Sequence, residues 1–305
     1  LTINGNGGGT VGVGTGIDFG LNSSATVANG NMSLTGVGGS GTGTQNRGIM
    51  LHDSASLTAT GIGNISLDGT GNGTGANNGG IGIEGSTVST NSGDISLDGT
   101  GSADGTNYNE GVELFSTATV TSTTGDITLS GTAGGSGRYN RGVSISKSTV
   151  QASGGNLTVT GDGATTGTLN YNQGIYAQGS TLSAAGGLTL TGNGGTGTSN
   201  NHGVQIHSTS VLASGALSIT GTANAGTSGT LNTGVYVSNL STLNGSIGLG
   251  SLITGIGGGG TDKNHGIFMA KDTVTNLLLG NFDGTAGAPG TPNSLDLTGG
   301  HALFV

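Results

Sequence analysis

The sequence contains no cysteine and no tryptophan, and only two of its 305 residues are proline. Because there is no cysteine, neither a disulfide framework nor a cysteine-based zinc site can form. No stretch approaches the roughly 18 apolar residues that a membrane-spanning helix needs. We therefore expect a protein that does not span a membrane and that binds no metal ion or cofactor.

Positive charge is also scarce in this chain. There are 6 Lys and Arg residues against 15 Asp and Glu residues, which gives a net charge of -9. A surface of this sign repels phosphate backbones and anionic lipid. Nucleic acid is therefore not an expected partner.

Glycine dominates what is present, with 70 residues, while charged residues make up 7% and aromatic residues 3% of the chain. This composition is typical of a disordered linker. However, 31% of the residues are hydrophobic, and Leu, Ile and Val recur at regular places. Aliphatic residues in such an order can form a core if strands stack, so we expect a folded repeat protein.

The repeat is visible as ISLDGTG, which occurs at residues 65–71 and again at residues 95–101. A degenerate form, [LIVM]-[ST]-[LIV]-x-G, recurs every 29 to 33 residues. Its copies start at Leu1, Met32, Ile65, Ile95, Ile127, Leu157, Leu188, Leu217 and Ile247, the last with Gly at its second place. A period that varies by a few residues indicates fixed strands joined by loops of variable length.

Two further blocks follow in a constant order. The second, Asn-x-Gly-[IV]-x-[ILVMA], starts at Asn46, Asn78, Asn109, Asn140, Asn172, Asn201, Asn232 and Asn264, and the first unit keeps only Gly16 and Ile17 of it. The third, [ST]-[VL], lies at residues 26–27, 87–88, 119–120, 149–150, 181–182, 210–211, 242–243 and 273–274. Three short strands in each repeat predict a three-sided coil.

Each block alternates apolar and polar residues, so one side of every strand faces a core. An antiparallel stack of hairpins is the alternative, but three different blocks in constant order favour parallel winding, in which each block lies on its own copy. We predict an all-β, three-sided parallel β-helix over residues 1–275, with about nine coils of roughly 30 residues and a length of roughly 45 Å. Val159 should then pair with Leu129 and Leu190.

The asparagine column is the most regular polar feature. These residues are expected to hydrogen-bond their backbone or their copies in neighbouring coils, and both Asn and the following Gly tolerate a positive φ at a bend. Between them lies a variable place, expected to be exposed, which serves either as a recognition strip or as ordinary solvated surface. Its notable residues are Arg47, Glu110, Arg141, Gln173, His202 and His265, with Gly79 and Thr233 at the same place.

No residue set predicts catalysis. Asp68 and Asp98 share an outward place in adjacent coils, and paired carboxylates can hydrolyse polysaccharides. Their face offers no basic partner, and an open face cannot exclude water. The histidines do not form a set suited to zinc. We expect no catalytic residue and no enzymatic activity.

Units such as GNLTVTGDG, NQGIYAQGSTLSAAGG and LTLTGNG resemble the repeat region of large secreted bacterial adhesins of the filamentous-haemagglutinin type. The resemblance covers residues 1–275. It implies a right-handed parallel β-helix that is secreted and serves as a stalk or filament at the cell surface. The partners it implies are other copies of the chain, neighbouring surface proteins, and glycans or cell surfaces.

The pattern breaks in residues 276–305, which contain both prolines. This segment is expected to form either a last irregular coil or a connection to a partner chain. For the whole chain, a structural or adhesive rod is the first functional hypothesis. An extracellular filament or surface-layer subunit that assembles end to end is the second, and a polysaccharide-degrading β-helix enzyme is the third.

Overall fold

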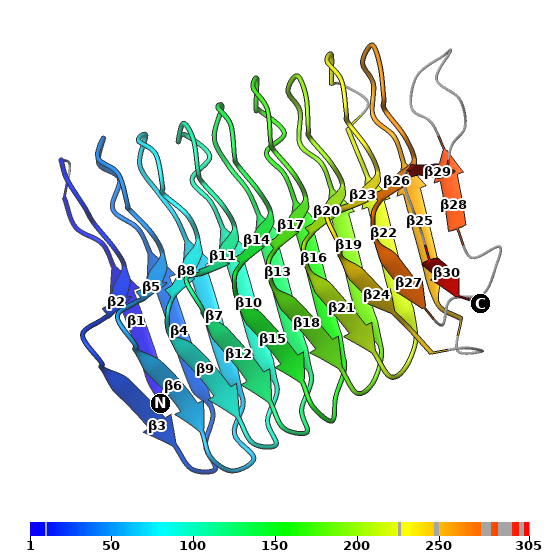
Figure 1. Ribbon diagram of the computed structural model, residues 1–305. Coiled ribbons are helices and arrows are strands. Elements are labelled where there is room, and N and C mark those ends of the chain that lie inside the picture. The colour runs from blue at the N-terminus through cyan, green and yellow to red at the C-terminus, as the bar shows by residue number, and fades with distance from the viewer. Residues whose placement is uncertain are drawn as a thin grey trace.

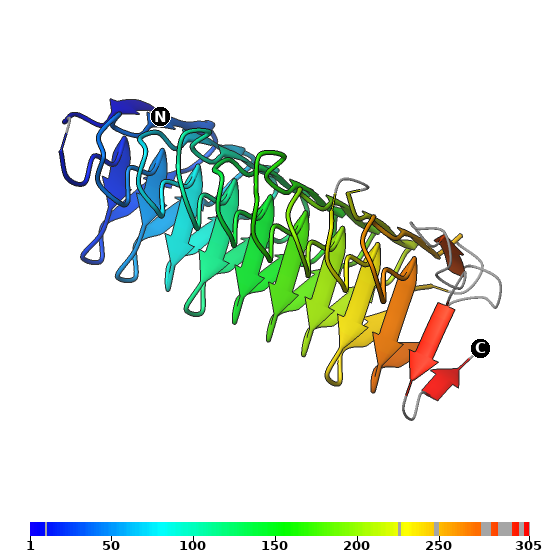
Figure 2. The ribbon, with the colours of Figure 1, turned by 90° about the horizontal axis from the view of Figure 1, so that it is seen from above.

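The computed structural model describes residues 1–9, 11–224, 227–246 and 250–275, together with three further strands within residues 282–304. All regular elements in these residues are β-strands, and they form three parallel sheets of ten strands each. Figure 1 shows the chain wound around a single axis, with one strand of each sheet in every turn. Seen from above, the coils stack side by side along a rod (Figure 2).

Sheet A holds the first strand of each coil. Its members are β1 (Thr2–Asn6), β4 (Met32–Val37), β7 (Ile65–Thr70), β10 (Ile95–Thr100), β13 (Ile127–Thr132), β16 (Leu157–Asp162), β19 (Leu188–Asn193), β22 (Leu217–Thr222), β25 (Leu252–Ile256) and β28 (Phe282–Thr285).

Sheet B holds the second strand of each coil. Its members are β2 (Ile17–Phe19), β5 (Ile49–Leu51), β8 (Ile81–Glu84), β11 (Val112–Phe115), β14 (Val143–Ser146), β17 (Ile175–Gln178), β20 (Val204–His207), β23 (Val235–Ser238), β26 (Ile267–Ala270) and β29 (Leu295–Thr298).

Sheet C holds the third strand of each coil. Its members are β3 (Ser24–Val27), β6 (Ser56–Ala59), β9 (Thr87–Thr90), β12 (Thr119–Ser122), β15 (Thr149–Ala152), β18 (Thr181–Ala184), β21 (Ser210–Ala213), β24 (Thr242–Asn244), β27 (Thr273–Thr275) and β30 (Ala302–Phe304). We number the coils 1 to 10, so that coil 1 comprises β1, β2 and β3.

The predicted parallel register is confirmed. Val159 pairs with Leu129 in the coil before it and with Leu190 in the coil after it. The inward Leu157 and Val159 are fully buried, whereas Thr158 and Thr160 are half-exposed. Equivalent aliphatic residues from all three sheets form one continuous core along coils 1 to 9. Each coil therefore covers the core of the next.

Two details of the predicted repeat are wrong. Ile247 lies outside the described residues, and the ninth strand of sheet A is β25, in which Gly255 pairs with Gly221. Ser251 lies at the first place of this block, where the other copies have an apolar residue. The sequence pattern therefore does not identify the strand. In coil 1, Ser24 and not Thr26 aligns with Ser56, so residues 26–27 lie two places beyond the third block.

Glycine is required where sheet A turns toward sheet B. A Cβ on Gly131 would lie 2.1 Å from the carbonyl oxygen of Gly142, and a Cβ on Gly142 would lie 2.7 Å from the carbonyl oxygen of Gly131. Two backbone segments therefore approach more closely than any side chain allows. The same pair of glycines recurs along the rod, which explains the regular Gly of the first two blocks.

The left-handed bend lies one residue earlier than the sequence suggested. The residue before each asparagine has a φ between 54° and 66°, whereas the asparagine itself does not have a positive φ. These left-handed residues are Gln45, Asn77, Tyr108, Tyr139, Tyr171, Asn200, Leu231 and Lys263. A bend that recurs in coils 2 to 9 tolerates unfavourable residue types because the neighbouring coils fix it.

Candidate functional site

The asparagine column forms a hydrogen-bonded ladder. From Asn46 to Asn232, the backbone N–H of each asparagine donates to Oδ1 of the asparagine in the next coil, over distances of 2.8–3.1 Å. The ladder runs through Asn46, Asn78, Asn109, Asn140, Asn172, Asn201, Asn232 and Asn264, all at most 1% exposed. These side chains satisfy backbone donors that would otherwise be buried without acceptors.

The variable place between Asn and Gly, which we call column X, is not an exposed strip. Arg47, Glu110, Gln173 and His202 are buried, and only Arg141 and His265 are half-exposed. The expectation of an exposed strip is therefore wrong for most of its residues. The structure places all of them on the same side of the rod, between the asparagine ladder and sheet B.

Column X side chains such as Arg141 and His202 extend along the rod axis and lie against a side chain of the next coil. Arg141 stacks on the ring of Tyr176, with 4.0 Å from its guanidinium carbon to the ring centroid. His202 stacks on Tyr236 with 4.7 Å between ring centroids. In each case the covering residue is the outward residue of the next strand in sheet B.

These covering residues form a second variable column, which we call column Y and which the sequence interpretation missed. In register along sheet B it contains Asp18, Met50, Gly82, Glu113, Ser144, Tyr176, Gln205, Tyr236 and Phe268. The signal that could have identified it is a position that always lies three residues after column X and never has the same residue type in two successive coils.

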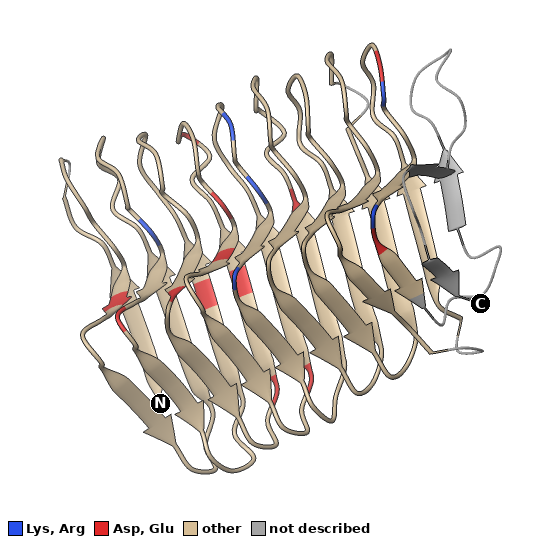
Figure 3. Cartoon of the chain, viewed as in Figure 1, with Lys and Arg blue, Asp and Glu red and all other residues tan. Residues whose placement is uncertain are grey.

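Chemical variety is concentrated on sheet B. The outward columns of sheets A and C consist mostly of serine and threonine, such as Thr158, Thr189 and Thr181. All six Lys and Arg residues lie in strands of sheet B or in the segments that flank them, as Figure 3 shows for the blue segments. The three sides of the rod are therefore not equivalent, and sheet B carries most of the side-chain variety.

Stacked aromatic rings reinforce this face in coils 4 to 6. Tyr108, Tyr139 and Tyr171 lie in successive coils with 4.9 Å between neighbouring ring centroids. Arg141 lies between Tyr139 and Tyr176, at 5.1 Å and 4.0 Å from their centroids. Offset aromatic stacking and cation–π contacts hold these side chains in one arrangement.

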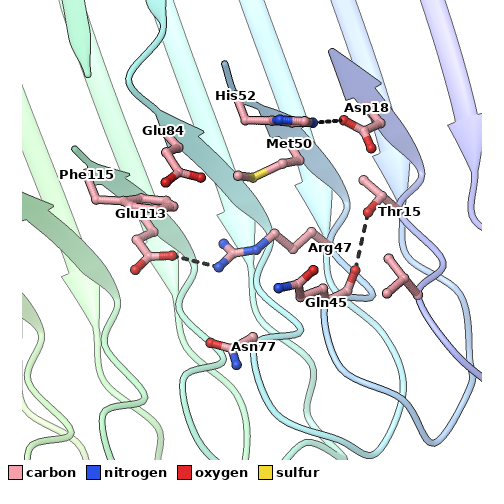
Figure 4. A pocket seen from close by; sticks show the side chains of 11 residues that line it. Thr15, Asp18, Gln45, Arg47, Met50, His52, Asn77, Glu84, Glu113 and Phe115 are labelled. Carbon is pink, nitrogen blue, oxygen red and sulfur yellow. Dashed lines mark hydrogen bonds and ion pairs between the residues drawn. The ribbon is translucent and has the colours of Figure 1, made fainter. Parts of the chain in front are cut away.

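Coils 1 to 4 carry a hollow on sheet B (Figure 4). Its volume is about 470 Å³. The lining residues are Val13, Thr15, Asp18, Gln45, Arg47, Met50, His52, Asn77, Glu84, Glu113 and Phe115. We call this feature the sheet-B hollow. A volume of this size is typical of sites that bind small molecules.

Two sets of charged residues fix the walls of the sheet-B hollow. Nη2 of Arg47 lies 2.8 Å from Oε2 of Glu113. His52 bridges two carboxylates, with Nε2 2.8 Å from Asp18 and Nδ1 2.9 Å from Asp53. Burial lowers the pKa of His52, but the hydrogen bonds to Asp53 and Asp18 and their charges raise it more, so the net shift is upward from 6.5.

Two buried titratable groups lie in column X. Burial, together with the charge of Glu113, raises the pKa of Glu110 to about 8, although Arg141 and Arg47 oppose the shift. Neither carboxyl oxygen of Glu110 has a hydrogen-bond partner among the described residues. Burial lowers the pKa of His202 to about 3, and its Nδ1 accepts a hydrogen bond from the backbone N–H of Thr233.

The carboxylate pair considered for hydrolysis lies on sheet A. Asp68 and Asp98 are in register in adjacent strands, and both are exposed. Neither forms an ion pair with a described residue, and the described chain contains no cluster of three His, Asp or Glu residues suited to a metal ion.

No known protein family matches the chain, and neither does any curated protein or solved structure. Within the described residues there is no helix long and apolar enough to cross a membrane.

Proposed function

We propose that this chain is a stiff structural rod of a secreted bacterial surface protein, with an adhesive face on sheet B. The observation that carries the proposal is the unbroken parallel register of all three sheets across ten coils. Each coil is stabilised by its neighbours, so the length of such a rod is set by the number of repeats. Reach and stiffness, and not chemistry, are what this architecture provides.

Removal of one complete coil tests the rod. Deletion of residues 157–187 joins coil 5 directly to coil 7 in register, because Leu188 occupies the place of Leu157. The shortened protein should remain folded, and its long dimension in small-angle scattering should fall by about 4.8 Å. The proposal would be contradicted if the shortened protein did not fold. It would also be contradicted if the full-length chain scattered as a compact particle.

End-to-end assembly into a filament is the second candidate. Ile3, Phe19 and Ala25 in coil 1 are only partly buried. Sheet strands with a free edge pair readily with strands of another molecule. Negative-stain images at increasing protein concentration distinguish the two: separate rods of constant length support the first function, and fibres that grow with concentration support the second.

The proposed rod has no enzymatic role. Incubation with uronate-rich polysaccharides should release no new reducing ends. Release of such ends, abolished by the change Asp98→Asn, would replace the rod hypothesis with a hydrolytic one.

A further inference from the structure

One of the coils that line the sheet-B hollow lacks side chains at two neighbouring places. Gly79 and Gly82 are the only glycines of columns X and Y within the described residues, and both belong to coil 3. A Cβ on Gly82 would lie 2.7 Å from Nη1 of Arg47 and 2.8 Å from Sδ of Met50. Arg47 therefore crosses coil 3 and reaches Glu113 in coil 4, 66 positions further along the chain.

Arg47 is built into the floor of the hollow with unused donor capacity. Its side chain is only 9% exposed. Within the described residues, Nη1 has no hydrogen-bond acceptor. A buried guanidinium donor without an acceptor is costly, and an oxygen atom of a ligand would satisfy it. The Met50 side chain beside it is flexible and can move aside.

The charge of the hollow is negative. The Arg47 guanidinium neutralises Glu113, and His52 is shared between Asp18 and Asp53. Glu84 lines the hollow but forms no ion pair with any described residue. These four carboxylates outnumber Arg47 and a protonated His52 by two, so acidic or sulfated ligands are disfavoured and a ligand with a positive group is favoured.

The remaining lining residues match a sugar ring. Gln45, Asn77 and Thr15 supply hydroxyl and amide groups, which donate to and accept from ligand hydroxyls. Phe115 supplies a flat apolar wall on the same side of Arg47 as Glu84 in Figure 4. A pocket with an apolar wall and a few convergent polar groups is typical of small-ligand sites.

We propose that the sheet-B hollow binds an oligosaccharide that carries free amino groups. The ammonium group lies against the Glu84 carboxylate, the apolar face of the sugar ring packs on Phe115, and hydroxyl groups bond to Asn77, Gln45 and Nη1 of Arg47. The inference deepens the proposed adhesive function of sheet B and rests on it, because it assigns that face a ligand class.

The test is a titration of the whole chain with three tetrasaccharides, followed by calorimetry and by NMR of the labelled protein. The probes are β-1,4-linked glucosamine, the same chain with every amine acetylated, and a sulfated oligosaccharide. We expect the glucosamine chain to bind and to shift the resonances of residues around Gly82. The acetylated chain should bind about tenfold more weakly, because it lacks the charge-assisted contact, and the sulfated one should not bind.

Two matched variants locate the site. Glu84→Gln removes one charge while keeping the size of the side chain, and it should weaken binding about tenfold. Asp68→Asn removes one unpaired carboxylate from sheet A, on another face of the rod, and should leave binding unchanged. Thermal unfolding of both variants establishes that they are folded.

Several results would overturn the inference. They are equal binding of the acetylated and free-amine chains, equal losses in the two variants, or no binding by the wild-type chain. In a separate titration with a lysine-rich peptide, equally tight binding at the same residues would also overturn it. Failure of the rod proposal would be separate, since it would be seen in scattering and images without any sugar. Conversely, if the protein forms a rod but binds none of the three probes, the proposed ligand site is refuted and the rod proposal stands.

Discussion

Oδ1 of Asn140 accepts a hydrogen bond of 2.9 Å from the backbone N–H of Asn109, one coil earlier in the rod. The Nδ2 group of Asn109 donates to the same oxygen at 3.2 Å. Both residues are fully buried. One amide oxygen thus satisfies two buried donors, and the same arrangement joins Asn46 to Asn78 and Asn201 to Asn232.

The change Asn140→Ala should destabilise the protein by about 1–3 kcal/mol, because the Asn109 N–H would be buried without an acceptor. Urea unfolding measures the loss. Thr128→Ala removes an exposed side chain from sheet A of the same coil and should change the free energy of unfolding by less than about 0.5 kcal/mol. Similar effects of the two changes would show that the ladder does not stabilise the fold.

The change Gly131→Ala should cost about 3 kcal/mol, because its Cβ would lie 2.1 Å from the Gly142 carbonyl oxygen and two backbone segments would have to separate. Gly30→Ala is the control, since a Cβ on Gly30 meets no atom within 4 Å. That change should be neutral or stabilise by up to about 1 kcal/mol. Chemical denaturation compares the two, and equal stability would rule out the close approach.

Glu110 should make stability fall as the pH rises. Its pKa is about 8 in the folded chain against a usual value of 4.5, so between these values the folded state holds a proton that the unfolded state releases. The free energy of unfolding should therefore decrease from about pH 5 to about pH 8 and then level off.

The variant Glu110→Gln should lack this part of the slope and should be more stable than the wild type at pH 9 by about 1–3 kcal/mol. Denaturation curves at pH 5, 7 and 9 provide the comparison. If the free energies of unfolding of the wild type and the variant differ by the same amount at all three pH values, Glu110 is ionised in the folded protein.

The pKa values of His202 and His52 are shifted in opposite directions from the usual 6.5. His202, with a pKa of about 3, should remain neutral in NMR spectra down to about pH 4, while the midpoint for His52 should lie above 6.5. The unfolded chain takes up a proton at His202 below about pH 6.5, so this residue lowers stability as the pH falls from there toward 3.

The contribution of His52 has the opposite sign. Its raised pKa stabilises the fold below about pH 6.5, and this contribution disappears as the pH rises through the folded-state pKa. Asp18→Asn should lower the His52 midpoint, and it should leave His202 untouched. A His202 signal that titrates near pH 6 would contradict its burial.

Local pattern was sufficient to predict most of the fold. The alternation of Leu157, Thr158 and Val159 assigns each side chain to a face within one strand, and a constant order of three blocks implies that like residues stack. The pairing of Val159 with Leu129 and Leu190 followed from these two facts. The strand predicted to start at Ile247 begins at Leu252 instead, because the glycine that the turn requires is Gly255.

The candidate site could not be predicted in the same way. Burial of Glu110 and His202 depends on side chains in neighbouring coils, about 30 residues away, and the sequence next to them is as polar as any exposed loop. The bridge from Arg47 to Glu113 exists only because Gly79 and Gly82 fall in the coil between them.

The sequence by itself determined the period, the three strands of each coil and the inward face of each strand, because these properties depend on neighbours along the chain. Only the tertiary structure decided which outward residues are covered and where a hollow opens on sheet B. Those properties depend on the side chains that adjacent coils place against one another at the spacing of hydrogen-bonded strands.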